Sequence, residues 1–272
     1  DLHKEASSVP LSMKTARSFM KRDLEASSSL AEEPNLNDFF EIGTSEEFAE
    51  EESPNESPAD IEEIPDLQES EIFEALHKKS RKRSAACPLD GASFQLLYQA
   101  VSHSPSFLKR IWDTFNLCWK KSYFPRRFKH AYLIFIPKAS GKWRPISLLP
   151  CLGKIYEEVI RNRLTCISLP HFLYGFISNR STELCLLNRV GQVLSSSEFQ
   201  SWIDLDLANA FSNVTINCFS AGWARLTPRP PEYLRRLCLS YLSDRKVSTQ
   251  SSSAWIKNCV PQGGILSPLL FN

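Results

Sequence analysis

Two short apolar runs separated by a polar turn occupy residues 131–149, with the sequence AYLIFIPKASGKWRPISLL. The first run is too short, and too rich in β-branched and aromatic residues, to favour a helix, so it predicts a buried strand. The Ala-Ser-Gly-Lys segment that follows leads into the second run, which predicts another strand. The stretch therefore indicates a β-hairpin.

Amphipathic helices are predicted on both sides of this hairpin. In residues 152–164 the apolar side chains recur on one helical stripe, and the charged side chains, Glu157 and Glu158 among them, fall outside it. Because this helix and its neighbours flank short strands, we expect an α+β fold in which helices pack on a small sheet. The other predicted elements are helices at 105–121, 181–194 and 231–244 and a strand at 199–205.

Charge divides the chain near residue 85. Residues 1–85 hold 10 Lys and Arg and 21 Asp and Glu (10 − 21 = −11), whereas residues 86–272 hold 22 and 10 (22 − 10 = +12). A basic half suits a polyanionic partner such as nucleic acid. An ordinary solvated basic surface would carry the same charge, so charge alone leaves both interpretations open.

The acidic part has the composition of a disordered segment. Residues 1–85 are rich in Ser, Glu and Pro, and such a segment cannot bury enough apolar surface to offset its ordering entropy. We expect a mostly disordered linker here, with transient helix at 11–28 and 69–79, and a second domain over 86–272. The run KKSRKR at 78–83 favours a solvated basic linker over a nuclear-localisation signal.

The cysteines and the termini bound the cellular context. The eight cysteines lie far apart, without a CxxC pair or a Cys/His cluster at zinc-ligand spacing, so we expect reduced thiols. No apolar run approaches the roughly 20 residues that cross a bilayer, which predicts an intracellular protein of the cytoplasm and/or nucleus with no membrane partner. Because the chain begins at Asp1 and ends at Asn272 directly after an apolar run, we expect both ends to be cut.

Two carboxylates mark a candidate metal site. Asp204 and Asp206 are two residues apart at the end of the predicted strand, and therefore project from the same face of it. Hard oxygen ligands of this kind can hold a divalent cation for phosphoryl transfer. Paired Asp residues are more often plain surface charge, and the pair alone leaves the choice open.

A resemblance to reverse transcriptases is carried by the segment SWIDLDLANAFSNV at 201–214. It is similar to the first palm motif of that family, in which a metal-binding Asp is followed four and five residues later by Ala and an aromatic residue. The positions that match are Asp206, Ala210 and Phe211. The resemblance implies that Asp206 binds metal and that Phe211 is the steric gate against ribonucleotides, and it assigns no role to Asp204.

A second resemblance to this family lies in VPQGGILSPLLFN at 260–272, which is similar to the Pro-Gln-Gly and Ser-Pro pattern followed by an apolar helix. The glycines allow a close backbone approach, and Gln262 offers an amide donor and acceptor. By resemblance, Gln262 and Gly263 contact the incoming nucleotide and the template. A tight turn before a buried helix would explain the glycines and the proline but not Gln262.

The hairpin resembles the fingers hairpin of these polymerases, where a Lys and an Arg reach the nucleotide triphosphate. Lys138 and Arg144 match those positions, Lys as a point charge and Arg as a bidentate fork. The strings RPISLL and GFISNRST resemble enzymes of non-LTR, LINE-type retrotransposons. In the second string the resemblance implies that Gly175, Phe176 and Arg180 bind nucleic acid.

Taken together, the resemblance covers about residues 86–272 and implies fingers and a partial palm, with helices packed on an antiparallel sheet. It implies an RNA-directed DNA polymerase that uses deoxynucleoside triphosphates, an RNA template, a DNA primer and two Mg²⁺ ions. The family's other metal-binding carboxylates, in an Ala-Asp-Asp sequence downstream of the Pro-Gln-Gly motif, are missing from these 272 residues. We therefore weigh an inactive retroelement relic that at most binds nucleic acid, and a basic protein-interaction module, against a polymerase fragment.

Overall fold

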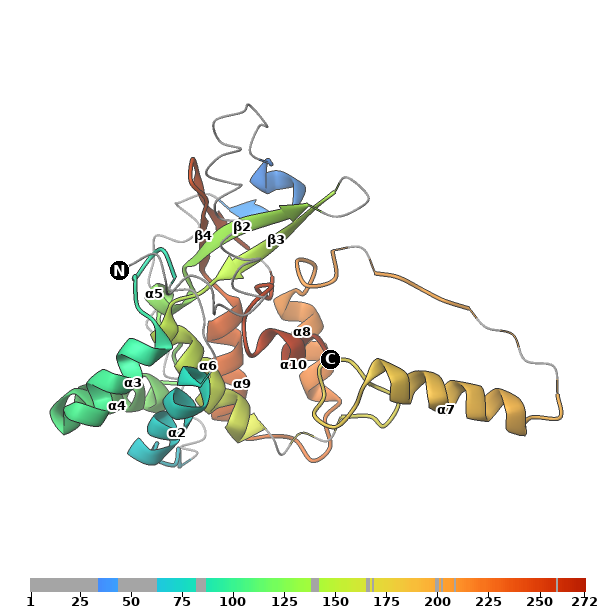
Figure 1. Ribbon diagram of the computed structural model, residues 1–272, viewed down its shortest axis with the longest axis horizontal. Coiled ribbons are helices and arrows are strands. Elements are labelled where there is room, and N and C mark those ends of the chain that lie inside the picture. The colour runs from blue at the N-terminus through green and yellow to red at the C-terminus, as the bar shows by residue number, and fades with distance from the viewer. Residues whose placement is uncertain are drawn as a thin grey trace, which may run out of the picture.

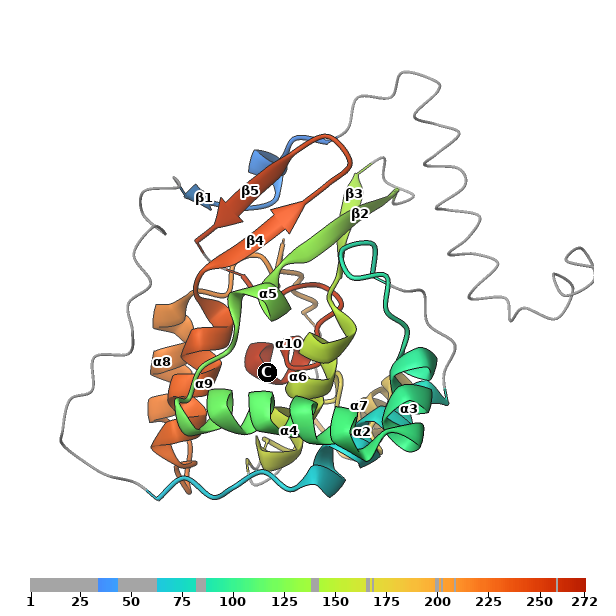
Figure 2. The same ribbon diagram turned by 90° about the vertical axis from the view of Figure 1, so that its left-hand side faces the viewer.

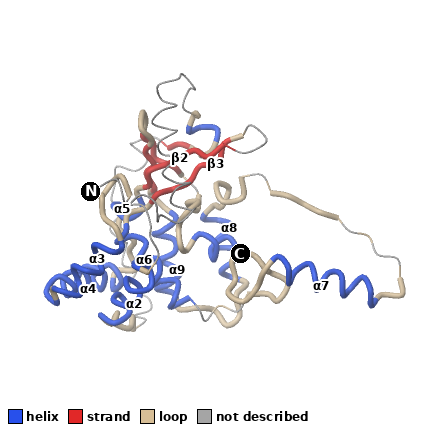
Figure 3. The backbone as a smooth tube through the Cα atoms, viewed as in Figure 1, coloured by secondary structure: helices blue, strands red, loops and turns tan. Residues whose placement is uncertain are grey.

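The protein is described by a computed structural model over residues 34–43, 63–81, 87–137, 142–164, 167, 169–198, 201, 203–207, 209–257 and 259–272. A small sheet lies above a block of helices, and one helix, α7, reaches away from both (Figures 1 and 3). The predicted α+β class is confirmed. The elements are η2 (Leu36–Asp38), β1 (Ile42–Gly43), α2 (Glu69–Ser80), α3 (Phe94–His103), α4 (Pro105–Lys120), α5 (Arg126–Lys129), β2 (Ala131–Pro137), β3 (Trp143–Leu148), α6 (Cys151–Arg163), α7 (Thr182–Ser195), α8 (Ile216–Ala224), α9 (Glu232–Leu242), β4 (Arg245–Ser248), β5 (Ser253–Ile256) and α10 (Ser267–Phe271).

The predicted hairpin is confirmed as β2 and β3, which pair antiparallel with Ile134 opposite Ile146 and Ile136 opposite Arg144. Side chains alternate along β2, so that Leu133 and Phe135 are buried while their neighbours are half exposed. One face of β2 therefore packs against the core, while its other face is partly exposed although it is also apolar. Most of its turn, residues 138–141, lies outside the described residues.

The sheet has five strands in the order β1-β5-β4-β2-β3. The prediction of an antiparallel sheet is wrong for one pair, because β2 and β4 run parallel, with Ala131 opposite Val247. A parallel pair needs a long crossover, and here the crossover contains β3 and helices α6 to α9. The fold thus returns the chain to the hairpin after the segment that carries Asp206.

The ordered part of the chain begins earlier than its composition predicts. Helix α2 buries Ile72 and Leu76, and the indole Nε1 of Trp112 donates to the carbonyl of Leu67 at 2.7 Å. Farther upstream, the Phe39 ring packs at 5.3 Å from the ring of Phe135 of β2. The predicted helix at 69–79 is formed as α2, although it is packed rather than transient. The prediction of disorder is wrong for the other described residues of this segment, because local apolar side chains within an acidic background pack against the domain. The predicted transient helix at 11–28 lies outside the described residues.

Helix α6 lies in the middle of the helical block (Figure 2), where it packs against α2 and contacts α4 through Tyr156 and Phe115 and α9 through Glu157 and Tyr241. The sequence predicts a helix with one apolar stripe, but Glu157 and Glu158 are both fully buried. Glu158 is neutralised by Lys78 and Lys79 of α2 and by Arg161, with N–O distances of 2.9, 3.2 and 2.5 Å. The apolar stripe therefore marks only one of the buried sides of α6, because the side that carries Glu157 and Glu158 is buried too.

Helix α7 forms at the predicted position, yet buries none of its residues. Leu194 is 81% exposed, and in the extended segment that follows, Ile203 and Leu205 are 81% and 91% exposed. The strand predicted at 199–205 is not formed by its described residues. A strand needs hydrogen-bonding neighbours for its backbone, and none of the described strands lies beside this segment.

Within the described chain, no helix has the length and apolar character to span a bilayer.

Lys129, at the end of α5, is a buried lysine whose titration should make the free energy of unfolding depend on pH. Its Nζ donates to the carbonyls of Ser240 and Ser243 at 2.7 and 2.9 Å, and burial, aided by the positive charge of Arg245, lowers its pKa from 10.5 to about 7. The unfolded chain therefore binds more protons between these values, so the free energy of unfolding contributed by this group rises with pH across that window.

We expect Lys129→Met to flatten the pH dependence of the free energy of unfolding. The slope from pH 7 to 9 should drop relative to the unmodified protein by up to about 1.4 kcal/mol per pH unit. Urea titrations at several pH values measure it, and Lys109→Met on the exposed face of α4 is the control. Equal slopes for the two variants would contradict a buried, neutral Lys129.

Candidate functional site

The turn at residues 261–266 packs directly against the hairpin. The backbone N–H of Ser147 in β3 donates to the carbonyl of Gln262 at 2.7 Å. Gly263 has a φ of +127°, and a Cβ at this position would lie 2.5 Å from the carbonyl oxygen of Ser147. Only glycine accepts both this backbone conformation and this approach. The structure therefore requires a glycine where the sequence resemblance places a nucleotide contact.

Phe211 lies beside the same turn, since its carbonyl accepts from the N–H of Val260 at 3.0 Å. Its ring stacks on Phe271 with a centroid distance of 5.2 Å and an interplanar angle of 22°. The ring of Phe176 meets it edge-on at 6.0 Å. The structure thus brings together the neighbourhoods of three predicted site residues, Phe176, Phe211 and Gln262, which are far apart in the sequence.

The loop at 170–180 is held in place from two directions. The side-chain amide of Asn272 donates to the carbonyl of Gly175 at 2.9 Å. The Arg180 guanidinium donates to the carbonyls of Pro170 and Leu173, which ties the loop to itself. Phe176 remains 71% exposed on this loop. Arg180 therefore has a structural role here, whereas Gly175 and Phe176 are among the exposed residues of the loop.

Of the two predicted triphosphate contacts in the hairpin, the structure describes Arg144 but not Lys138. Arg144 is exposed on β3, three positions before the buried Ser147. Because side chains alternate along a strand, the Arg144 side chain leaves β3 on the face opposite to the Ser147 side chain, whereas the turn meets Ser147 through its backbone. Its predicted contact with a triphosphate stays a prediction. Lys138 lies outside the described residues.

Asp204 and Asp206 lie in the extended, exposed segment 203–207. A carboxylate is a suitable hard ligand for a magnesium ion, so the chemistry of Asp206 fits a single metal contact. Among the described residues, however, no three His, Cys, Asp or Glu side chains gather into a group that could hold a metal. The carboxylate of Asp206 is therefore a suitable ligand for Mg²⁺, but the described residues provide too few ligands to hold the ion.

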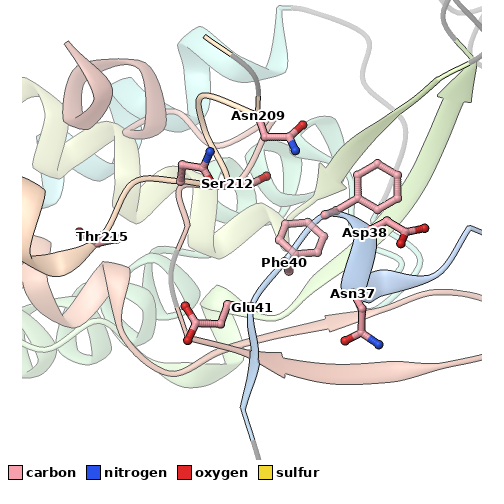
Figure 4. A pocket seen from close by; sticks show the side chains of 9 residues that line it. Asn37, Asp38, Phe40, Glu41, Asn209, Ser212 and Thr215 are labelled. Atoms are coloured by element: carbon pink, nitrogen blue, oxygen red, sulfur yellow. The ribbon is translucent and has the colours of Figure 1, made fainter.

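A cavity that the sequence did not predict lies between the N-terminal segment and the turn after Asp206. It has a volume of about 350 Å³, and Asp38, Glu41, Asn209 and Ser212 are among the side chains around it (Figure 4). Asp38 and Glu41 come from the acidic segment, which the predicted domain division kept apart from the site. Apolar residues beside them, Leu36 with Phe39 and Phe40, pack in one cluster with the buried residues of β2 and were the local signal of packing.

Comparisons with known proteins agree on a family. Residues 136–272, about half of the chain, match a family model described as reverse transcriptase (RNA-dependent DNA polymerase). A Drosophila melanogaster protein named probable RNA-directed DNA polymerase from transposon BS is 26% identical over 253 residues, which cover 86% of this chain and 27% of that protein. The RNA-directed DNA polymerase from mobile element jockey of Drosophila melanogaster is 35% identical over 178 residues, 58% of this chain.

A third relative, a putative 115 kDa protein in type-1 retrotransposable element R1DM of Drosophila melanogaster, is 28% identical over 253 residues, which cover 87% of this chain and 23% of that protein. The alignment with the jockey protein covers 19% of its length. The chain therefore spans between about a fifth and about a quarter of the length of these relatives.

Proposed function

The chain belongs to the reverse transcriptase family, with relatives in non-LTR retrotransposons, and on that premise we propose that it forms the nucleotide- and template-binding part of an RNA-directed DNA polymerase. The observation that carries this proposal is the contact between the two motifs, in which the Phe211 carbonyl accepts from Val260 beside the Gln262 turn. The reaction would be templated transfer of a deoxynucleotide to a DNA 3'-hydroxyl.

The residues divide this work by their chemistry. Lys138 and Arg144 would contact the triphosphate, while Gln262 and Gly263 would line the nucleotide and template side of the pocket. Enzymes of this family use divalent metal ions, and Asp206 would supply one carboxylate ligand for Mg²⁺. The net charge of +12 over residues 86–272 supports an RNA template and a DNA primer as partners.

A second candidate function is nucleic-acid binding without catalysis, as expected of a retroelement relic. The specific observation in its favour is that Asp206 is joined by no further metal-ligand cluster within the described residues. The basic charge of residues 86–272 would still support binding in that case, since phosphate contacts do not require the metal.

DNA synthesis by the protein at its full length separates the two candidates. The assay supplies an RNA template, a labelled DNA primer, deoxynucleoside triphosphates and Mg²⁺, and records primer extension. Template-dependent extension supports the polymerase. Salt-sensitive binding of the template–primer without extension, under conditions in which a control polymerase extends, supports the relic.

Phe211 allows a prediction about sugar selection. We expect Phe211→Val to reduce the preference for deoxynucleotides over ribonucleotides by about ten- to a hundredfold, because a smaller side chain frees the space of a 2'-hydroxyl. Single-nucleotide incorporation with both substrates gives the ratio of the two values of kcat/KM.

Phe271→Leu is the matched control for this substitution, because it removes the stacking partner of Phe211 and leaves the Phe211 side chain intact. That variant should keep the ratio of the two efficiencies. If Phe211 served only as a packed aromatic, Phe211→Val would cost stability and lower both efficiencies together, with an unchanged ratio.

A further inference from the structure

Glu157 is a buried carboxylate to which neither the family resemblance nor the proposed reaction gives a role. It lies in α6 and is fully buried, next in sequence to Glu158. The two residues differ in their partners, because Glu158 is surrounded by three cationic side chains, whereas Glu157 faces backbone amides. Its surroundings therefore suggest a function other than an ion pair.

The Oε2 atom of Glu157 is an acceptor shared by the turn. It accepts from the backbone N–H of Ile265 at 2.5 Å and of Leu266 at 3.0 Å, and from the Tyr241 hydroxyl at 3.3 Å. The other oxygen, Oε1, is buried with no hydrogen-bond partner among the described atoms. One oxygen atom of α6 thus satisfies two buried amides of the Pro-Gln-Gly segment.

The same segment is confined from its other side. A Cβ on Gly263 would collide with the carbonyl of Ser147, and a Cβ on Gly264 would lie 2.6 Å from the Tyr241 hydroxyl. The turn therefore fits between β3 on one side and Tyr241 with Glu157 on the other. Movement of the acceptor on Glu157 would release the turn from one of these two boundaries.

We propose that Glu157 is a positioning residue, which holds the turn at 261–266 through its Oε2 acceptor so that Gln262 and Gly263 face the incoming nucleotide. The inference rests on the proposed function for the nucleotide contact, but the geometry of the turn can be tested independently. The required feature is an oxygen at this distance from α6, since the two buried amides of the turn need an acceptor.

Burial raises the pKa of Glu157, while the hydrogen bonds from the Leu266 and Ile265 amides act in the opposite direction, so reach and charge have to be separated by experiment. Two substitutions of Glu157 separate the effect of the oxygen's reach from the effect of its charge. Glu157→Gln keeps an oxygen at the same reach and removes the charge, whereas Glu157→Asp keeps the charge and withdraws the oxygen by one methylene.

Hydrogen exchange of the Ile265 and Leu266 amides in the 272-residue chain tests the positioning. We expect Glu157→Asp to speed their exchange by about tenfold relative to amides in the core of α9, and Glu157→Gln to leave it within about twofold. Glu158→Gln is the control, since it changes a buried carboxylate of the same helix that does not contact the turn. Fast exchange in the Gln variant with slow exchange in the Asp variant would overturn the proposal.

Kinetics of the protein at full length test the consequence for the nucleotide. Glu157→Asp should raise KM for deoxynucleotides by about tenfold with a smaller change in kcat, and Glu157→Gln should restore the KM of the unmodified protein. An unchanged KM in a variant whose turn exchanges faster would overturn the positioning role while the polymerase proposal stands. Absence of synthesis by the unmodified protein would instead remove the proposed function, and the nucleotide role of Glu157 with it.

Discussion

Replacing Asp206 by Ala should reduce DNA synthesis by the protein at full length by roughly a thousandfold or more, because a lost metal ligand forfeits several kcal/mol of transition-state stabilisation. Asp206 lies in an exposed, extended segment, so its removal should leave the fold intact. Primer extension on an RNA template measures the loss, and a thermal melt of the same preparation reports folding.

Asp204→Ala is the matched control for this experiment. Asp204 lies two residues away in the same exposed segment and carries the same charge, but the family motif gives it no role. Its replacement should leave synthesis within a few-fold of the unmodified protein. Equal losses in the two variants would show that the segment contributes negative charge rather than one specific ligand, and a larger loss for Asp204→Ala would shift the motif register by two residues.

Gly263→Ala should destabilise the domain by about 2–4 kcal/mol and disrupt nucleotide binding at the same time. Two costs act together, since alanine is strained at a φ of +127° and its Cβ would lie 2.5 Å from the Ser147 carbonyl oxygen. Neither atom in this contact is the flexible end of a side chain, so relief requires backbone movement. Urea unfolding of the variant and of the unmodified protein measures the difference.

Gly191→Ala provides the contrast, because the same substitution in α7 meets open space and a helical backbone. There alanine should raise the stability of the helix by about 0.5–1 kcal/mol. If Gly263→Ala were as well tolerated as Gly191→Ala, the close approach between the turn and β3 would be wrong, and the position of Gln262 with it.

Local patterns in the chain were sufficient for much of the fold. The short run AYLIFIP, rich in β-branched and aromatic residues, predicted β2, and helices α4, α6, α7 and α9 formed where the apolar residues recur at helical spacing. Helix α9 begins one residue later than predicted, because Pro231 caps it from outside. These elements were predictable because the evidence for each lies within a few turns of backbone.

The same patterns misjudged segments whose state depends on distant neighbours. Residues 203–207 alternate like a strand, but the described fold places no strand beside them, and their apolar side chains remain exposed. For residues 69–79 the sequence predicted only a transient helix because of the acidic composition around it, whereas α2 packs firmly against the domain through Ile72 and Leu76. Composition counts every residue of a segment, whereas packing depends only on the residues of the face that contacts the domain.

The sequence by itself determined the family, the α+β class and the identity of the candidate residues Asp206, Phe211 and Gln262, because motif spacing and local periodicity are properties of short segments. Only the tertiary structure decided that Phe211 and the Gln262 turn meet, and that Glu157 is buried beneath that turn. The amides that Glu157 binds are 108 and 109 positions away in sequence. Burial and hydrogen bonding at such separations are set by which distant segments the fold brings into contact, and no local pattern records that choice.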